Sequence, residues 1–254
     1  MSNSQLSIQI SRTSVHVAEV LASNQSVERE FNMELFESNA GAYREKLKAF
    51  FDQLPLKENY NEYTLAWESP MQTLVPLSVY NESSSKHIFS LMFGEDIDEN
   101  TVDFTRLMEL GMVSVYEIPD WVKSFFIMRF PRITIRHEHA MIVRALFQRN
   151  TFKRKVVLTI NDHYLNIDVI HRDELHFSNS FEYQNAEDII YYLLFVLEQE
   201  KLTKEEGDFQ ILFAGEKLNE IAESVKQQLI QLKPFDKVVV NTPESVFKLH
   251  TLCV

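Results

Sequence analysis

The sequence predicts an α/β fold in which one plan of strands and helices occurs twice. Short runs in which apolar residues alternate with period two, as in strands, are separated by apolar stripes at helical spacing. An order of three strands, a helix and a fourth strand is predicted near the N-terminus and again in the second half. The chain has 254 residues, of which 45% are hydrophobic and 24% are charged. This is the composition of a globular protein, and the length suits two domains.

The first copy of this plan opens the chain. Two alternating runs flank a short polar turn, and the same alternation continues in a third run. The predicted elements are strands at 6–10, 15–21 and 27–36, a helix that begins at a cap of Ser38 or Asn39 and ends near Gln53, and a strand at 63–67. We therefore expect an antiparallel hairpin with a third strand, followed by a helix and a fourth strand.

The second copy repeats this order and extends it. Asn185, with Asp188 three residues later, is typical of a helix cap. The predicted elements are strands at 155–160, 165–170 and 175–180, a helix from the Asn185 cap to Glu200, a strand at 209–213, a helix at 216–231 and a strand at 235–240.

The stretch between the two copies has no counterpart in the second half. Its predicted elements are a strand at 73–80, a helix at 83–93, a strand at 113–118, a helix from Pro119 to Arg129, a strand at 132–136 and a helix at 139–148. The boundary between the halves is expected just after this last helix. The predicted domains are therefore residues 1–149 and 150–254.

Glycine is scarce in this chain. An average usage of about 7% would give roughly 18 glycines in this length, and the chain has five. No two of them lie close together in the sequence, which excludes the phosphate loops GxGxxG and GxxxxGK[ST]. Such loops need positive φ angles or a close backbone approach, which residues with a Cβ atom supply poorly.

Charge and cysteine content exclude further classes of protein. The net charge is −12, and both halves share the acidic excess, so broad electrostatic binding to nucleic acid or to an anionic membrane is disfavoured. The single cysteine, Cys253, excludes an intrachain disulfide bond and zinc sites with two or more cysteines. The N-terminus lacks a signal-like segment, and no apolar stretch is long enough to span a bilayer. We expect a cytoplasmic protein without direct membrane insertion.

The duplicated plan resembles the actin-like ATPase fold, in which two ribonuclease H-like halves face each other across a nucleotide cleft. Residues 156–161 with 165–170 resemble the second phosphate hairpin of that family, and residues 210–216 resemble its adenosine motif. The chain looks most like an uncharacterised bacterial family with a degenerate actin-like fold. It is also similar in outline to the cytoplasmic actin-like proteins of type IV pilus and type II secretion machines.

The resemblance implies two phosphate hairpins, each with an aspartate at the end of its first strand and a glycine two residues later. In active members the aspartate positions magnesium, and the N–H groups of the turn hold phosphate oxygens. Other residues stand at these cleft positions here: Gln9 and Ser11 in the first hairpin, Thr159 and Asn161 in the second, and Ala214 beside Gly215 in the adenosine motif. No acidic residue precedes Glu19, so we expect no carboxylate at the first hairpin. Catalytic residues, metal ligands and a cofactor are therefore not expected.

The leading functional hypothesis is a non-catalytic binding or scaffold module with a degenerate nucleotide site and another protein as its partner. The alternative is a divergent nucleotide-dependent phosphotransferase or ATPase whose carboxylates have been relocated, for example to Asp162 in the second turn. Asp162 and the neighbouring His163 are interpreted more simply as turn residues, because Asn and Asp tolerate unusual φ angles.

Two other motifs have both a functional and a structural interpretation. The triplet His137-Glu138-His139 would suit a metal ion if it formed a strand, because both histidines would then share a face; we favour the exposed start of a helix. In the stretch from Arg129 to Lys155, every charged residue except Glu138 is basic, which would suit an anion or a nucleic acid. We favour a solvated charged face, since the rest of the chain is acidic.

Overall fold

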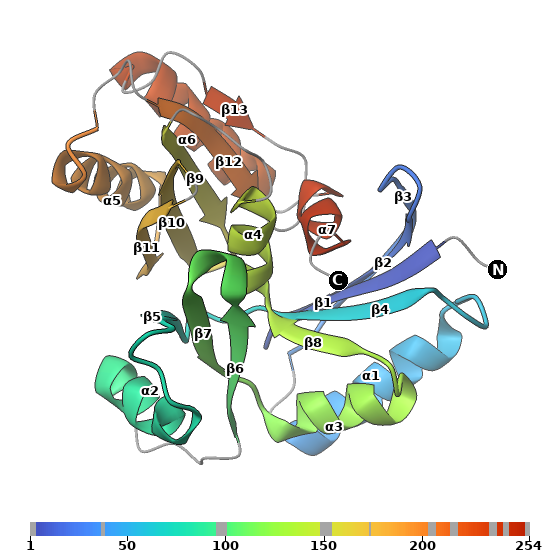
Figure 1. Ribbon diagram of the computed structural model, residues 1–254. Coiled ribbons are helices and arrows are strands. Elements are labelled where there is room, and N and C mark those ends of the chain that lie inside the picture. Colours follow the sequence, from blue (N-terminus) through green and yellow to red (C-terminus); the bar gives the residue numbers. More distant parts are fainter. Residues whose placement is uncertain are drawn as a thin grey trace. The chain divides into compact units, whose positions relative to one another are not determined.

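The computed structural model describes residues 4–36, 39–94, 101–147, 154–172, 174–202, 207–213, 218–233, 238–240 and 244–251 (Figure 1). The chain forms two compact units. The first consists of Met1–Ala145 together with Phe247–Val254, and the second of Leu146–Val246. The α/β class predicted from the sequence is confirmed, whereas the domain limits of 1–149 and 150–254 stay a prediction.

A five-stranded sheet forms the centre of the first unit, with the order β3-β2-β1-β4-β8. Its strands are β1 (Ser4–Ile10), β2 (Ser14–Leu21), β3 (Val27–Glu34), β4 (Glu62–Trp67) and β8 (Thr134–His137). β2 is antiparallel to both of its neighbours, β1 and β3, as predicted. β4 runs parallel to β1, and β8 runs parallel to β4, so the carboxyl ends of these three strands lie at one edge of the sheet.

Two helices, α1 (Ala40–Gln53) and α3 (Asp120–Arg129), pack against this sheet. Asn39 is the N-cap of α1, because its side-chain oxygen accepts the N–H of Ala42 at 3.0 Å. Phe51 of α1 and Phe126 of α3 are buried and meet edge to face, with ring centroids 5.6 Å apart. The helix α3 begins one residue later than predicted, since Pro119 is its N-cap.

A second sheet of the first unit has three antiparallel strands in the order β5-β7-β6. It consists of β5 (Gln72–Pro76), β6 (Val102–Leu107) and β7 (Met112–Glu117), and α2 (Ser85–Phe93) packs on it. β5 is shorter than the predicted strand because the chain turns after Pro76, which has no N–H for a further ladder bond. The sequence does not predict β6, since Arg106 interrupts the apolar face that Val102 and Phe104 begin.

The second unit has a sheet of the same kind, with the order β11-β10-β9-β12-β13. Its elements are β9 (Arg154–Ile160), β10 (Tyr164–His171), β11 (Glu174–Glu182), β12 (Gly207–Phe213) and β13 (Val238–Val240), with the helices α5 (Ala186–Gln199) and α6 (Asn219–Leu232). β9, β10 and β11 are antiparallel, and β12 and β13 continue in parallel with β9. In each unit the sheet therefore runs in the order third, second, first, fourth and fifth strand, which confirms the predicted repeat.

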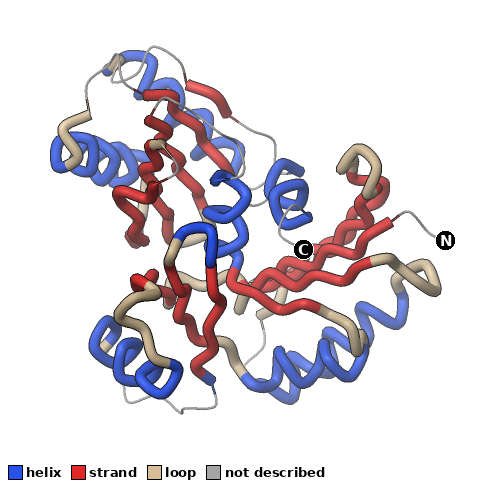
Figure 2. The backbone as a smooth tube through the Cα atoms, viewed as in Figure 1, coloured by secondary structure: helices blue, strands red, loops and turns tan. Residues whose placement is uncertain are grey.

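The last helix of the chain, α7 (Glu244–Thr251), is not predicted from the sequence. Phe247 on this helix is buried against Ala18 and Val20 of β2. The chain therefore returns to the first unit at its end (Figure 2). The helix α4 (Glu138–Phe147) follows β8 directly, close to the predicted range. Among the helices described, none combines the length and apolar character needed to cross a bilayer.

Candidate functional site

Three polar residues meet at the carboxyl ends of the parallel strands of the first unit. Gln9 is the last residue but one of β1, Glu68 directly follows β4, and Glu138 directly follows β8. The register brings their strand ends together, because Ile10 is paired with Trp67 and Trp67 with His137. In open α/β sheets this edge is the usual place of a ligand.

Gln9 joins the two carboxyl groups. Its Nε2 donates to Glu138 Oε1 at 2.7 Å and to Glu68 Oε2 at 3.1 Å. All three side chains are buried, Glu138 completely. Burial, and next the charge of Glu68, raise the pKa of Glu138 well above its usual value of 4.5, while the hydrogen bond from Gln9 opposes this. The buried triad of Gln9, Glu68 and Glu138 thus favours a protonated, neutral Glu138.

The carboxyl groups of the triad do not come from the first hairpin. No acidic residue precedes Glu19 on β2, and the residues that follow β4 and β8 supply the two carboxyl groups from distant parts of the chain. The sequence analysis does not indicate Glu68, and it considers Glu138 only as part of the triplet with His137 and His139, because nothing local in the chain places either residue beside Gln9. The signal that would have found them is an acidic residue directly after a buried strand that runs parallel to β1.

The helix α7 adds a histidine to the surroundings of the triad. His250 Nε2 lies 4.0 Å from Glu138 Oε1, and both side chains are fully buried. Burial lowers the pKa of His250 to about 3, so its imidazole is neutral near pH 7. In the described part of the chain, neither ring nitrogen of His250 nor Glu138 Oε2 has a hydrogen-bond partner. A neutral histidine and a neutral carboxyl are the forms that such a site favours.

The stability of the first unit is expected to depend on the protonation of His250. Its folded pKa of about 3 lies below the unfolded value of about 6.5, so this stabilisation is present above pH 6.5 and is lost as the pH falls toward 3. The expected loss is about 1.4 kcal/mol per pH unit for one proton. His250→Gln should remove this contribution. Urea unfolding followed by tryptophan fluorescence measures it, because both tryptophans, Trp67 and Trp121, belong to the first unit.

Two other buried groups contribute to the same pH profile. His137, whose pKa is also lowered to about 3, acts in the same direction as His250, and Glu138, whose pKa is raised, acts in the opposite one. The difference between the wild type and His250→Gln isolates His250. His87→Gln, at an exposed position of α2, is the control for the substitution of a histidine by glutamine. Identical profiles for His250→Gln and the wild type would contradict the prediction.

The triplet His137-Glu138-His139 spans the junction of β8 and α4, because His137 ends the strand and Glu138 begins the helix. All three residues are buried, whereas an exposed helix start was expected. His137 Nδ1 accepts the N–H of His139 at 3.2 Å, and His137 Nε2 lies 3.0 Å from the carbonyl oxygen of Ser69. The neutral imidazole that carries its proton on Nε2 satisfies both contacts. The described residues include no group of three or more His, Cys, Asp or Glu side chains placed to hold a metal ion.

The turn of the first hairpin is closed by a serine side chain. Ser11 Oγ accepts the N–H groups of Thr13 at 3.1 Å and of Ser14 at 3.0 Å. The N–H of Ser11 in turn donates to the carbonyl of Ser14 at 2.9 Å. The N–H groups of Ser11, Thr13 and Ser14 are therefore all bound within the turn.

The second hairpin has an equivalent turn, in which the N–H of Asn161 donates to the carbonyl of Tyr164 at 2.9 Å. Thr159 and Asn161 are fully buried, and their side-chain polar atoms have no hydrogen-bond partner among the described residues. Asp162 is exposed at the tip of the turn, as a turn residue would be. Ala214 and Gly215 of the adenosine motif lie outside the described residues.

The basic stretch from Arg129 to Lys155 is distributed over several elements. Arg129 at the end of α3 pairs with Asp52 at 2.8 Å, and Arg144 on α4 pairs with Glu109 at 2.5 Å. Lys155 is buried in β9. The arginines with carboxylate partners have much of their charge balanced locally, which weakens the interpretation of this stretch as a polyanion-binding surface.

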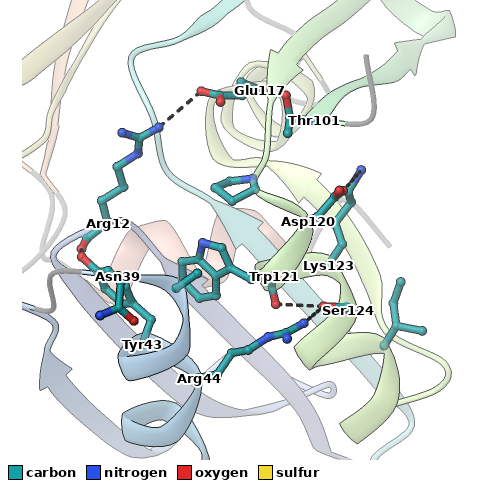
Figure 3. A pocket seen from close by; sticks show the side chains of 13 residues that line it. Arg12, Asn39, Tyr43, Arg44, Thr101, Glu117, Asp120, Trp121, Lys123 and Ser124 are labelled. Atoms are coloured by element: carbon teal, nitrogen blue, oxygen red, sulfur yellow. Dashed lines mark hydrogen bonds and ion pairs between the residues drawn. The ribbon is translucent and has the colours of Figure 1, made fainter. Parts of the chain in front are cut away.

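An open groove of about 1170 Å³ lies between α1 and α3 in the first unit (Figure 3). Tyr43 of α1 stacks on Trp121 of α3, with ring centroids 5.0 Å apart and planes inclined by 20°. The Tyr43 hydroxyl donates to the backbone carbonyl of Arg12 at 2.5 Å, which holds the hairpin turn at the rim. The sequence shows both aromatic residues as core positions of their helices, and it does not indicate that they line a groove.

Ion pairs occupy most of the charged groups of this groove. Arg12 pairs with Glu117 at 3.4 Å, and Lys123 lies 3.7 Å from Asp120. Arg44 differs, because its guanidinium donates to the neutral hydroxyl of Ser124. Figure 3 shows the side chains of Arg44 and Ser124 meeting across the space between the two helices.

The shared strand order of the two units, with helices on the sheets and ligand-site positions at the strand ends, defines a protein of the actin-like ATPase fold, built from two ribonuclease H-like halves. This confirms the resemblance predicted from the sequence. The chain belongs to the DUF3822 family, a family of proteins of unknown function, whose sequence model matches residues 1–247. No curated protein matches the sequence.

Solved structures support the same fold. A Bacteroides thetaiotaomicron protein with an actin-like ATPase fold and unknown function is similar with a TM-score of 0.80 and 20% identity, over 100% of this chain and 97% of that one. A chain of the PilM–PilN type IV pilus biogenesis complex is similar with a TM-score of 0.56 and 14% identity, over 95% of this chain and 89% of that one. The ethanolamine utilization protein EutJ of Carboxydothermus hydrogenoformans is similar with a TM-score of 0.53 and 11% identity, over 99% of this chain and 90% of that one.

Proposed function

We propose that the protein is a non-catalytic binding module with an actin-like fold, in which the first nucleotide-binding hairpin has become a self-contained polar cluster and the partner is another protein. The observation that carries this proposal is the contact of Gln9 with both Glu68 and Glu138. A neutral amide holds the two carboxyl groups at the place where an active member would use an aspartate and a divalent cation.

The chemistry of the triad opposes magnesium binding. Mg²⁺ takes ionised carboxylates in near-octahedral geometry. Glu138 favours its protonated form, and the oxygen that it directs toward Gln9 already accepts a hydrogen bond. A cation would have to displace the amide and remove the proton of a fully buried carboxyl group, and both steps cost free energy.

The turn of the first hairpin supports the same conclusion. A phosphate group would have to compete with Ser11 Oγ for the N–H groups of Thr13 and Ser14. An acceptor within the same turn has little entropy to lose on binding, whereas a free nucleotide loses its translational and rotational freedom.

A relative of the same fold provides the precedent for a protein partner. The PilM–PilN complex is an assembly of type IV pilus biogenesis, and one of its chains shares this fold. The groove between α1 and α3 offers aromatic and charged groups on the first unit for such a contact.

Magnesium and ATP are expected to leave the protein unaffected. A ligand that binds only the folded state raises its stability by RT ln(1 + [L]/Kd), so about 1 mM MgATP would raise the melting temperature measurably if the dissociation constant were micromolar. We expect no shift in a thermal melt and no heat in a calorimetric titration.

Micromolar binding that is lost in Asp162→Ala or Glu138→Gln would overturn the non-catalytic function. AMP, ADP and ATP are also titrated without magnesium, because a degenerate site could still bind a nucleotide after it had lost its metal ion. Micromolar binding of any of these would count against the proposal as well.

A nucleotide-dependent enzyme is the second candidate, and one observation favours it. A buried carboxyl group with a raised pKa beside a second carboxyl is an arrangement that general acids and bases use. This candidate predicts hydrolysis of ATP that is abolished in Glu138→Gln. Asp162, which the sequence suggested as a relocated carboxylate, is exposed, whereas Glu138 is fully buried.

A further inference from the structure

We propose that the groove between α1 and α3 binds a short acidic segment of a partner protein, with Arg44 as the residue that receives a carboxylate. This inference rests on the proposed function as a protein-binding module and assigns it a place and a chemistry. Arg12, Arg44, Trp121 and Ile127 line the groove together.

The charges that line the groove favour a partner with a negative group. Glu117 already has Arg12 as its partner, and Asp120 has Lys123. Arg44 is exposed on α1, and within the described part of the chain its guanidinium contacts the Ser124 hydroxyl and no carboxylate. Guanidinium presents several N–H donors in one plane, which match a carboxylate in a bidentate geometry. The unsatisfied charge of the groove is therefore positive, in a protein whose net charge is −12.

The apolar surface and the size of the groove favour a peptide over a small molecule. Trp121, stacked on Tyr43, forms an aromatic wall beside Arg44, and Ile127 on α3 is 52% exposed although it is a large apolar side chain. A volume of about 1170 Å³ exceeds the range of about 300–1,000 Å³ that holds small ligands. An extended segment with one carboxylate and neighbouring apolar side chains uses all of these features.

The same features disfavour a nucleic acid. A polyanion gains affinity by releasing counterions from several phosphates at once, and needs several uncompensated cations for this. The groove has Glu117 and Asp120 at its rim, and these carboxylates would repel successive phosphates. A single carboxylate bound at Arg44 needs only one uncompensated cation and does not place further negative charges near Glu117 and Asp120.

Selection from a random short-peptide library displayed on phage, with the full-length protein as target, tests the proposal. Selected peptides are then labelled, and their dissociation constants are measured by fluorescence polarisation. We expect peptides enriched in Asp or Glu next to apolar residues. Arg44→Glu should weaken them by about tenfold or more. Changing the acidic residues of a peptide to Asn or Gln should weaken binding to the wild type by a similar factor.

Lys48→Glu is the matched control. Lys48 is exposed one turn further along α1 and does not line the groove, so this variant has the same change in charge and should bind within about twofold of the wild type. Ile127→Asp is a second variant at an exposed position, and it should weaken binding without affecting the fold. Thermal melts of all variants establish that they are folded.

The outcomes separate this inference from the proposed function. Peptides that bind Arg44→Glu as well as the wild type, or that lack acidic residues, would overturn the groove assignment and leave a protein-binding module. A library without any binder would count against both. Displacement of the peptides by ATP or by single-stranded DNA would overturn the assignment in favour of a nucleotide or a nucleic acid.

Discussion

Glu19→Ala is expected to lower the free energy of unfolding of the first unit by about 3 kcal/mol. Glu19 on β2 is completely buried, and its carboxylate binds Arg29 through two hydrogen bonds, of 2.7 and 2.8 Å. The hydroxyl of Tyr60 also donates to it, and Lys57 Nζ lies 3.8 Å away. Removing one member of a buried ion pair costs several kcal/mol, because its partners lose their counter-charge.

The loss is expected to be about 3 kcal/mol, and not larger, for a structural reason. The side chains of Arg29 and Lys57 are 38% and 35% exposed, so water can solvate their charges after the substitution. The control is Glu82→Ala, which removes an ion pair with Arg106 in which both side chains are about half exposed; a loss below about 1 kcal/mol is expected there. Urea unfolding followed by tryptophan fluorescence reads both variants. Equal losses in the two would show that the buried network adds nothing.

Gln9→Glu is expected to have an effect of similar size, about 3 kcal/mol near neutral pH. The substitution keeps the shape of the side chain but replaces the amide donor by a third buried carboxyl group. Glu68 and Glu138 then lose the donor that satisfies them. The same three carboxyl groups are oxygen ligands of the kind that divalent cations bind. Millimolar Mg²⁺ or Mn²⁺ should therefore raise the melting temperature of Gln9→Glu and leave that of the wild type unchanged.

Gln9→Met is the control for this experiment, because it removes the donor without adding a carboxyl group. It should be destabilised and should not respond to the cations. A Gln9→Glu variant as stable as the wild type would show that the amide does not hold the triad. Cation stabilisation of the wild type itself would contradict the non-catalytic proposal.

The repeated fold could be predicted because its signals are local. Period-two alternation marked β1 and β3, and the caps predicted at Ser38 or Asn39 and at Asn185 marked the starts of α1 and α5. Each of these signals lies within a few residues of the chain and depends on burial of one face or on a single cap. The order of the elements, found twice, then indicated the fold class.

The missing elements lacked such a signal. The strand β6 has an arginine on its apolar face, and α7 is a short helix whose Phe247 is buried only because it packs on β2. A helix of this length is marginal on its own, so tertiary contacts and not local propensity decide its formation.

The sequence by itself determined that this protein has a duplicated α/β plan, and that the end of the first strand and the turn after it carry glutamine and serine and no acidic residue. Only the tertiary structure decided what those replacements do. Glu68 and Glu138 are far from Gln9 in the chain, and they reach it because β4 and β8 run parallel to β1 and end at the same edge of the sheet. Parallel strands are joined by long connections, so the distance along the chain carries no information about which strand ends meet. The pairing of strands creates the buried triad, and burial in turn raises the pKa of Glu138.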